Sequence, residues 1–149
     1  MERHGKLIKV SVNPEIDTDA YTSNDVMGGL LTFDLSELTI NGGIINQAIM
    51  IDEDSLGVAA TLYVFDALPT TIADDAAFAP TIDDMNKLVA VIAFSSFTTV
   101  NSLDYSIVED INNIYSTDTG AIYGYLVTGG TPNPSTADAV TIRLYILSE

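Results

Sequence analysis

The sequence has no cysteine, no tryptophan and a single histidine, His4, among its 149 residues. Without cysteine there are no disulfides and no thiolate metal sites. One histidine near the N-terminus leaves no imidazole for a serine triad in the body of the chain, and too few for a histidine-based metal centre. We therefore expect no catalytic residues, no metal and no cofactor, and we expect that the protein is not an enzyme.

Positive charge is also scarce. Five Lys and Arg residues stand against 21 Asp and Glu residues, so the formal net charge is −16. A body this acidic repels phosphate backbones and anionic lipid headgroups. We therefore expect no nucleic-acid partner and no membrane partner.

Most of the few cations lie at the N-terminus, where Arg3, Lys6 and Lys9 are three of the five. Their clustering predicts a flexible basic arm over residues 1–6, followed by a single domain over residues 7–149. Such an arm would dock electrostatically onto an acidic neighbouring protein, with Arg3, Lys6 and Lys9 as the docking residues.

No apolar run reaches the roughly 18 residues needed to cross a bilayer. The first ten residues are charged and lack the apolar core of a secretory signal, so we expect a protein that is made and used without export. The apolar fraction of 47% is that of a globular chain, and 149 residues suit one domain.

The clearest strand signal lies within residues 21–34. Turn-forming residues lead into it, and apolar side chains then recur around the pair Gly28 and Gly29. Period-two apolar residues after turn formers indicate a strand. A glycine pair inside a strand indicates a bulge or a close approach of another backbone.

Further segments of strand length follow the same logic. They are residues 7–12, 44–51, 60–65, 88–94, 97–107, 121–128 and 140–147. In the segment 44–51 we expect Ile45, Ile49 and Ile51 on one face. In the segment 140–147 we expect the apolar residues on one face, and Thr141, Arg143 and Tyr145 on the other. Thr81 followed by acidic residues resembles a helix N-cap, so one short helix is expected over 82–87. About eight strands with at most one short helix predict an all-β protein, a β-sandwich of the jelly-roll type.

Paired acids recur in the loops, and the nearest approach to a calcium loop is the acidic segment 52–57. Leu56 and Tyr63 stand where that loop would need oxygen ligands. Paired carboxylates can hydrolyse glycosides when they face each other across a cleft, a geometry that sequence neighbours on one loop do not provide. We interpret these acids as solvated turns.

Aromatic residues recur on the predicted strands beyond what one buried sheet face requires. Because aromatic residues are enriched at protein interfaces, five of them are predicted to form an oligomer interface: Tyr63, Phe65, Tyr123, Tyr125 and Tyr145. Closed cyclic assembly is common for homo-oligomers, and a trimer is the expected form. The alternative is a carbohydrate-binding or adhesin-type module in which Tyr105, Tyr115, Tyr123 and Tyr125 stack on a sugar ring.

Several short motifs together resemble small virion structural proteins of tailed bacteriophages. They are the segments 25–29, 45–51, 62–65, 74–78, 83–91 and 142–147. The resemblance covers most of the chain from Leu7 onward. It implies a capsid decoration (cement) protein or the base of a head fibre, made in the host cytoplasm and carried on the outer surface of the virion. The implied partners are the major capsid protein and further copies of the chain, and no catalytic residues come with the resemblance.

Overall fold

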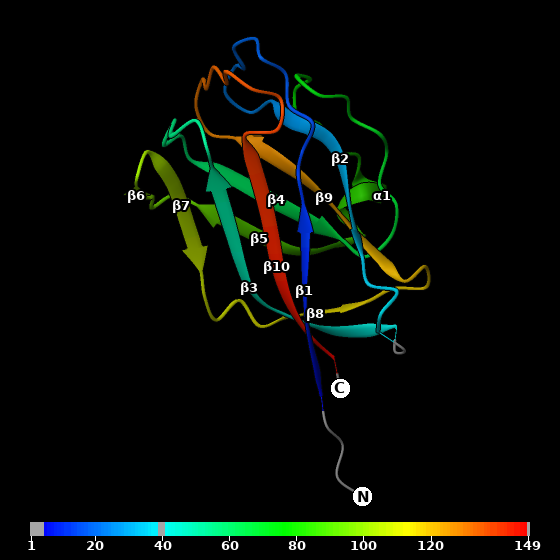
Figure 1. The fold of residues 1–149 in the computed structure, drawn as a ribbon. Coiled ribbons are helices and arrows are strands. Elements are labelled where there is room, and N and C mark those ends of the chain that lie inside the picture. The colour runs from blue at the N-terminus through cyan, green and yellow to red at the C-terminus, as the bar shows by residue number, and fades with distance from the viewer. Residues whose placement is uncertain (1–4, 39–40, 149) are drawn as a thin grey trace, which may run out of the picture.

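The computed structural model describes residues 5–38 and 41–148. Within these residues the chain forms ten strands and one short helix (Figure 1). They are β1 (Lys6–Val12), β2 (Val26–Asp34), β3 (Gly42–Asp52), β4 (Ala60–Phe65), α1 (Ile82–Met85), β5 (Leu88–Phe94), β6 (Thr98–Val100), β7 (Leu103–Val108), β8 (Asn113–Ser116), β9 (Ala121–Thr128) and β10 (Val140–Ser148). The predicted all-β class is confirmed. Because α1 has only four residues, the described part of the chain holds no helix able to cross a membrane.

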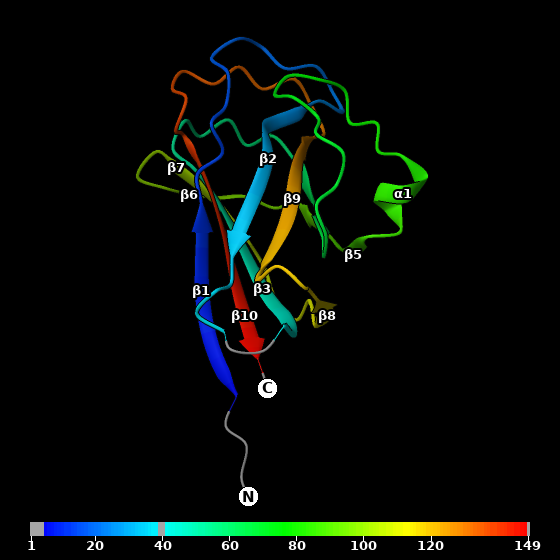
Figure 2. The same ribbon diagram turned by 90° about the vertical axis from the view of Figure 1, so that its right-hand side faces the viewer.

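The strands form two antiparallel sheets that pack face to face (Figure 2). One sheet has the order β1-β10-β3-β7-β6, with β8 also paired to β3, and the other has the order β2-β9-β4-β5. The first four strands alternate between the sheets, and β9 and β10 return to pair beside β2 and β1. This interleaving of two Greek keys is the jelly-roll arrangement. The predicted β-sandwich is confirmed, with β6 and β8 as short additions.

The core lies between the sheets and follows from the period of two along each strand. In β10 the side chains of Ile142, Leu144 and Ile146 are fully buried. Between them, Arg143 and Tyr145 are half-buried on the outer side of the sheet. The alternation expected for the last strand is therefore confirmed, and it aims one cation and one aromatic ring away from the core.

The face assignment expected for β3 is wrong. This strand carries an extra residue, Asn46, at which its register with β10 shifts. A bulge moves every later side chain to the opposite face. Ile45 is therefore buried in the core, and Met50 is buried after the bulge, while Ile49 and Ile51 lie on the outer face.

The bulge expected at the glycine pair in β2 is confirmed, since the register with β9 shifts across it. Gly28 and Gly29 have φ values of 86° and 64°, which favour glycine. A Cβ atom on Gly28 would lie 2.4 Å from Cβ of Pro14. The Gly28 N–H donates to Oδ1 of Asp74 at 2.6 Å, so the bulge also receives the long connection between β4 and β5.

That connection, residues 66–87, covers the outer face of the β2-β9-β4-β5 sheet (Figure 2). Ile72 and Phe78 from the connection pack on a second apolar cluster that contains Phe65 and Tyr125. The Tyr125 hydroxyl donates to the Thr70 carbonyl at 2.6 Å and accepts from the Ile72 N–H at 3.0 Å. The connection therefore buries the part of the outer face that carries Phe65 and Tyr125, while Val91 on β5 stays exposed.

The buried Asp84 carboxylate joins two parts of the connection by hydrogen bonds. It accepts the Thr70 N–H at 2.8 Å and the Thr81 N–H at 2.9 Å, and Thr81 caps α1 in return. These hydrogen bonds lower the pKa of Asp84 to about 2. Because the pKa is lower in the folded chain than in the unfolded chain, the carboxylate stabilises the fold above about pH 4, and this contribution is lost as the pH falls toward about 2.

We predict that Asp84→Asn lowers the free energy of unfolding at pH 7 by about 2 kcal/mol, because an amide nitrogen would face backbone donors. The exposed neighbour provides the control, since Asp83→Asn should change stability by less than about 0.5 kcal/mol. Urea unfolding measures both. The gap between the wild type and Asp84→Asn should narrow as the pH falls from about 5 toward 2. A gap that is constant over this range would contradict the assigned role.

Candidate functional site

The predicted docking cations lie on or before the first strand. Lys6 begins β1, one residue earlier than expected, and is therefore part of the strand, not of an arm. Its Nζ donates to the Glu37 carbonyl at 3.2 Å. Lys9 lies in the middle of β1 and is exposed. Arg3 lies outside the described residues.

Two of the predicted interface residues are buried within the subunit. Phe65 and Tyr125 are 0% and 1% exposed, because the β4–β5 connection lies over them. The prediction that they form an interface is therefore wrong. Tyr63 is half-buried against Phe78, with ring centroids 4.5 Å apart. Nothing in the alternation of a strand reveals that a distant loop covers its outer face.

The other two predicted interface residues remain partly accessible, on different sheets. Tyr123 lies in β9 and is half-buried, with its hydroxyl 3.4 Å from the Thr119 hydroxyl. Tyr145 lies on the outer side of β10, opposite Lys9 of β1. The structure thus brings one predicted docking residue and one predicted interface residue together on the same surface.

That surface is the outer face of the β1-β10-β3-β7-β6 sheet, which we call the open face. Figure 1 looks onto it, and in Figure 2 it lies on the side away from α1. Strand alternation and register assign these outward residues to it: Leu7, Lys9, Ser11, Ile44, Gln47, Ile49, Ile51, Thr98, Val100, Leu103, Tyr105, Ile107, Thr141, Arg143, Tyr145 and Leu147. Val100, Leu103 and Ile107 are exposed large apolar residues on this face.

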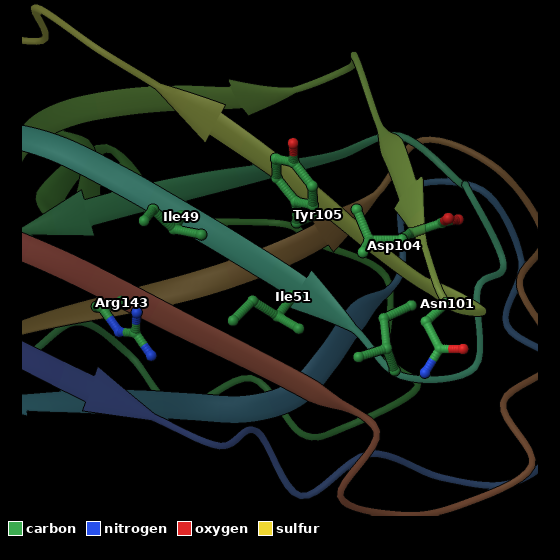
Figure 3. A pocket seen from close by; sticks show the side chains of 8 residues that line it. Ile49, Ile51, Asn101, Asp104, Tyr105 and Arg143 are labelled. Carbon is green, nitrogen blue, oxygen red and sulfur yellow. The ribbon is translucent and has the colours of Figure 1, made fainter.

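A hollow of about 550 Å³ lies within the open face (Figure 3). Its walls come from β10, β3, β6, β7 and the turn between β6 and β7. Arg143 is opposite Ile49, and Ile51 is opposite Tyr105, so the hollow lies across three hydrogen-bonded strands. The bulge at Asn46 in β3 creates this surface, because it turns Ile49 and Ile51 outward.

No acidic residue is among those assigned to the open face. Asp104 borders the hollow but is buried, and its Oδ1 accepts from the Ser55 hydroxyl at 2.8 Å. Figure 3 shows its carboxylate pointing away from Ile51 and Arg143. Asp52, at the end of β3, is also buried, and burial raises its pKa.

The cations of the open face are not neutralised within the described part of the chain. Over residues 5–38 and 41–148, no carboxylate lies within ion-pair distance of Lys9 or Arg143. Arg143 uses its Nε to donate to the Ser11 hydroxyl at 3.3 Å. In a protein of net charge −16, the assigned outward positions of this face thus carry two cations, no acid and several apolar side chains. Alternation in the last strand had placed Arg143 opposite the core, but its neighbours across the sheet could not be read from the sequence.

The side chains of the open face are of the kind that make non-covalent contacts with another surface. The tyrosines considered for sugar stacking are not brought together, because Tyr115 and Tyr125 are buried and Tyr123 belongs to the other sheet. Among the described residues, no three acidic or histidine side chains are grouped to hold a metal ion. Of the four tyrosines considered for sugar stacking, Tyr105 is the one that lines the hollow.

The chain matches no protein-family model and no curated protein. Among solved structures, one alignment is with a chain from the native virion of Kashmir bee virus at neutral pH, at 11% identity and a TM-score of 0.26. It covers 96% of this chain and 68% of that chain. A likeness this low carries no argument about function.

We predict different costs for two aromatic residues that the sequence had grouped together. Phe65→Ala should lower the free energy of unfolding by about 3–5 kcal/mol, because it opens a cavity beneath the β4–β5 connection. Tyr145→Ala should cost about 1 kcal/mol or less, because its ring lies on the open face. Urea unfolding of the two variants tests the assignment, and equal losses would contradict it.

Proposed function

We propose that this chain is a structural virion protein, a capsid decoration (cement) protein that binds the outer surface of the shell and stabilises it. Its partner would be the major capsid protein, and its place the outside of the virion after synthesis in the host cytoplasm. The proposal rests on the sequence resemblance to virion proteins of tailed bacteriophages and on the shape and charge of one surface.

The observation that carries the proposal is the open face. A sheet that exposes Val100, Leu103 and Ile107, with no acid among its outward residues, contrasts with the acidic loops around it. Protein interfaces combine an apolar centre depleted of charge with a polar rim. The open face has this composition, whereas the β4–β5 connection covers part of the opposite side of the sandwich.

The rest of the molecule suits a protein exposed on a particle. The core of the jelly roll is buried between the two sheets, and a second apolar cluster lies beneath the connection. This packing supports the strands of the open face. The net charge of −16 favours solubility and disfavours contact with a packaged genome.

Self-association is the second part of the proposal. With Phe65 and Tyr125 buried, the aromatic residues left for an interface between copies are Tyr63 and Tyr123 on one side of the sandwich and Tyr145 on the other. Capsid lattices offer three-fold positions that a closed trimer can occupy. A trimer would be held through the side that carries Tyr63 and Tyr123 and would leave the open face for the shell.

The attachment itself is tested on particles made from the genome that encodes this chain. We expect the protein in purified particles at a copy number comparable to that of the major capsid protein. Particles assembled without it should break open at a lower temperature in a dye-release assay. Its absence from purified particles would contradict the proposal, and specific binding on a glycan array would favour the carbohydrate-binding alternative.

The oligomeric state has its own test. Light scattering of the purified protein at physiological salt should give three times the chain mass, and Tyr123→Glu should reduce that mass without changing the fold. Tyr145→Glu is the matched control and should leave the trimer intact. A monomeric mass at high micromolar concentration would contradict free trimerisation.

A further inference from the structure

We infer that the open face is the docking surface, and that it binds a protein surface that presents carboxylates among apolar side chains. Arg143 would pair with a carboxylate near the centre of the contact, and Lys9 with one nearer its edge. The inference rests on the proposed function and deepens it, because the partner would then be the shell protein.

The registers of the sheet place the two cations as neighbours. Arg143 lies opposite Ser11, and Lys9 lies two residues before Ser11 on the same strand. Diagonal neighbours of this kind on one face have Cβ atoms roughly 7 Å apart or slightly less. Two carboxylates on one short segment of a partner could therefore be reached together.

Apolar side chains adjoin the cationic pair. The row that contains Arg143 continues through Ile49 to Ile107, and the next row carries Ile51 and Tyr105. Strands lie about 4.8 Å apart, so these rows extend the contact by roughly 10 Å beyond β10. A partner that covers Ile49 and Ile51 would exclude water from the guanidinium of Arg143 and strengthen its pairing with an acid.

The guanidinium has unused hydrogen-bonding capacity. Among the described residues its Nε donates to the Ser11 hydroxyl, and no hydrogen bond from its terminal nitrogens is present. Those nitrogens offer donors in a planar fork that matches a carboxylate. A half-buried arginine beside isoleucine side chains is therefore suited to an anionic group on a protein.

A second copy of this chain fits the open face poorly. In a two-fold contact, residues of one face meet the same residues of the other. That arrangement would place Lys9 and Arg143 against a surface with no assigned acid, between two bodies that each carry −16. Head-to-tail packing of acidic loops on the face would satisfy the cations, but the proposed trimer assigns the contact between copies to the side that carries Tyr63 and Tyr123.

Nucleic acid and membrane surfaces are also poor occupants. Both present dense negative charge, and the remainder of the chain would repel it. The exposed apolar side chains of Val100, Leu103 and Ile107 would gain nothing from a phosphate backbone. A protein surface with both acidic and apolar side chains can pair with the cations of the open face and also cover its apolar side chains.

Binding to shells tests the inference. Shells assembled from the same genome, with the gene for this chain deleted, are mixed with purified full-length variants, and bound protein is measured by co-sedimentation. Arg143→Gln should weaken binding about 30-fold or more, because it leaves a partner carboxylate unpaired. Ile51→Asp should abolish binding, because it places an acid within the apolar rows.

The matched control is Lys87→Gln, which removes one positive charge on the opposite side of the sandwich, beside Asp84. It should bind shells within about twofold of the wild type if position, not net charge, matters. Urea midpoints establish that each variant is folded. Raising the salt concentration should weaken the wild type more than Arg143→Gln, since the variant has lost a charge pair.

The possible failures are distinguishable. If the wild type does not bind shells, the proposed function is overturned, and the inference falls with it. If the wild type binds but Arg143→Gln and Ile51→Asp bind as well as Lys87→Gln, the inference alone is overturned. If Arg143→Gln changes the mass of the free protein and not its binding to shells, the face contacts a second copy, which also overturns the inference.

Discussion

The attachment of the β4–β5 connection to its sheet determines which surface of this molecule is free. The Tyr125 hydroxyl attaches the connection to the sheet through backbone groups of Thr70 and Ile72. Within the connection, the Asp84 carboxylate joins Thr70 to Thr81. Once the connection is in place, the outer face of the β2-β9-β4-β5 sheet is buried around Phe65 and Tyr125. Within the described residues, no such connection lies over the outer face of the other sheet, so this face is free along the whole length of its strands.

Most of the fold could be predicted from the sequence, because a period of two and turn residues are local signals. Most of the strands, the single short helix and the bulge at Gly28 and Gly29 follow from them. The segment expected as one strand over 97–107 instead forms β6 and β7, and β8 was not expected. The bulge at Asn46 has no such signal, since any residue can occupy it, and it inverted the faces expected for Ile49 and Ile51. The cover over Phe65 depends on a distant segment and is equally invisible in one strand.

The candidate site could be predicted only in part. The sequence predicts Lys9 as a docking residue and Tyr145 as part of an oligomer interface, which are two different surfaces. Nothing in it shows that β1 pairs with β10, almost the whole chain apart. The alternation of the last strand predicts that Arg143 points away from the core, but it predicts no function for this residue. The signal that could have found it is the lack of acids at the outward positions of several strands, which is unusual in a chain with 21 acids.

The central claim is that the open face contacts the shell. Hydroxyl-radical footprinting of the protein, free and bound to shells, measures the exposure of individual side chains directly. The account predicts that oxidation of Leu103, Tyr105 and Ile107 falls sharply on binding, while Leu68 and Ile82, exposed on the other side, stay as reactive as in the free protein. Protection of Leu68 and Ile82 with Leu103, Tyr105 and Ile107 unchanged would contradict it.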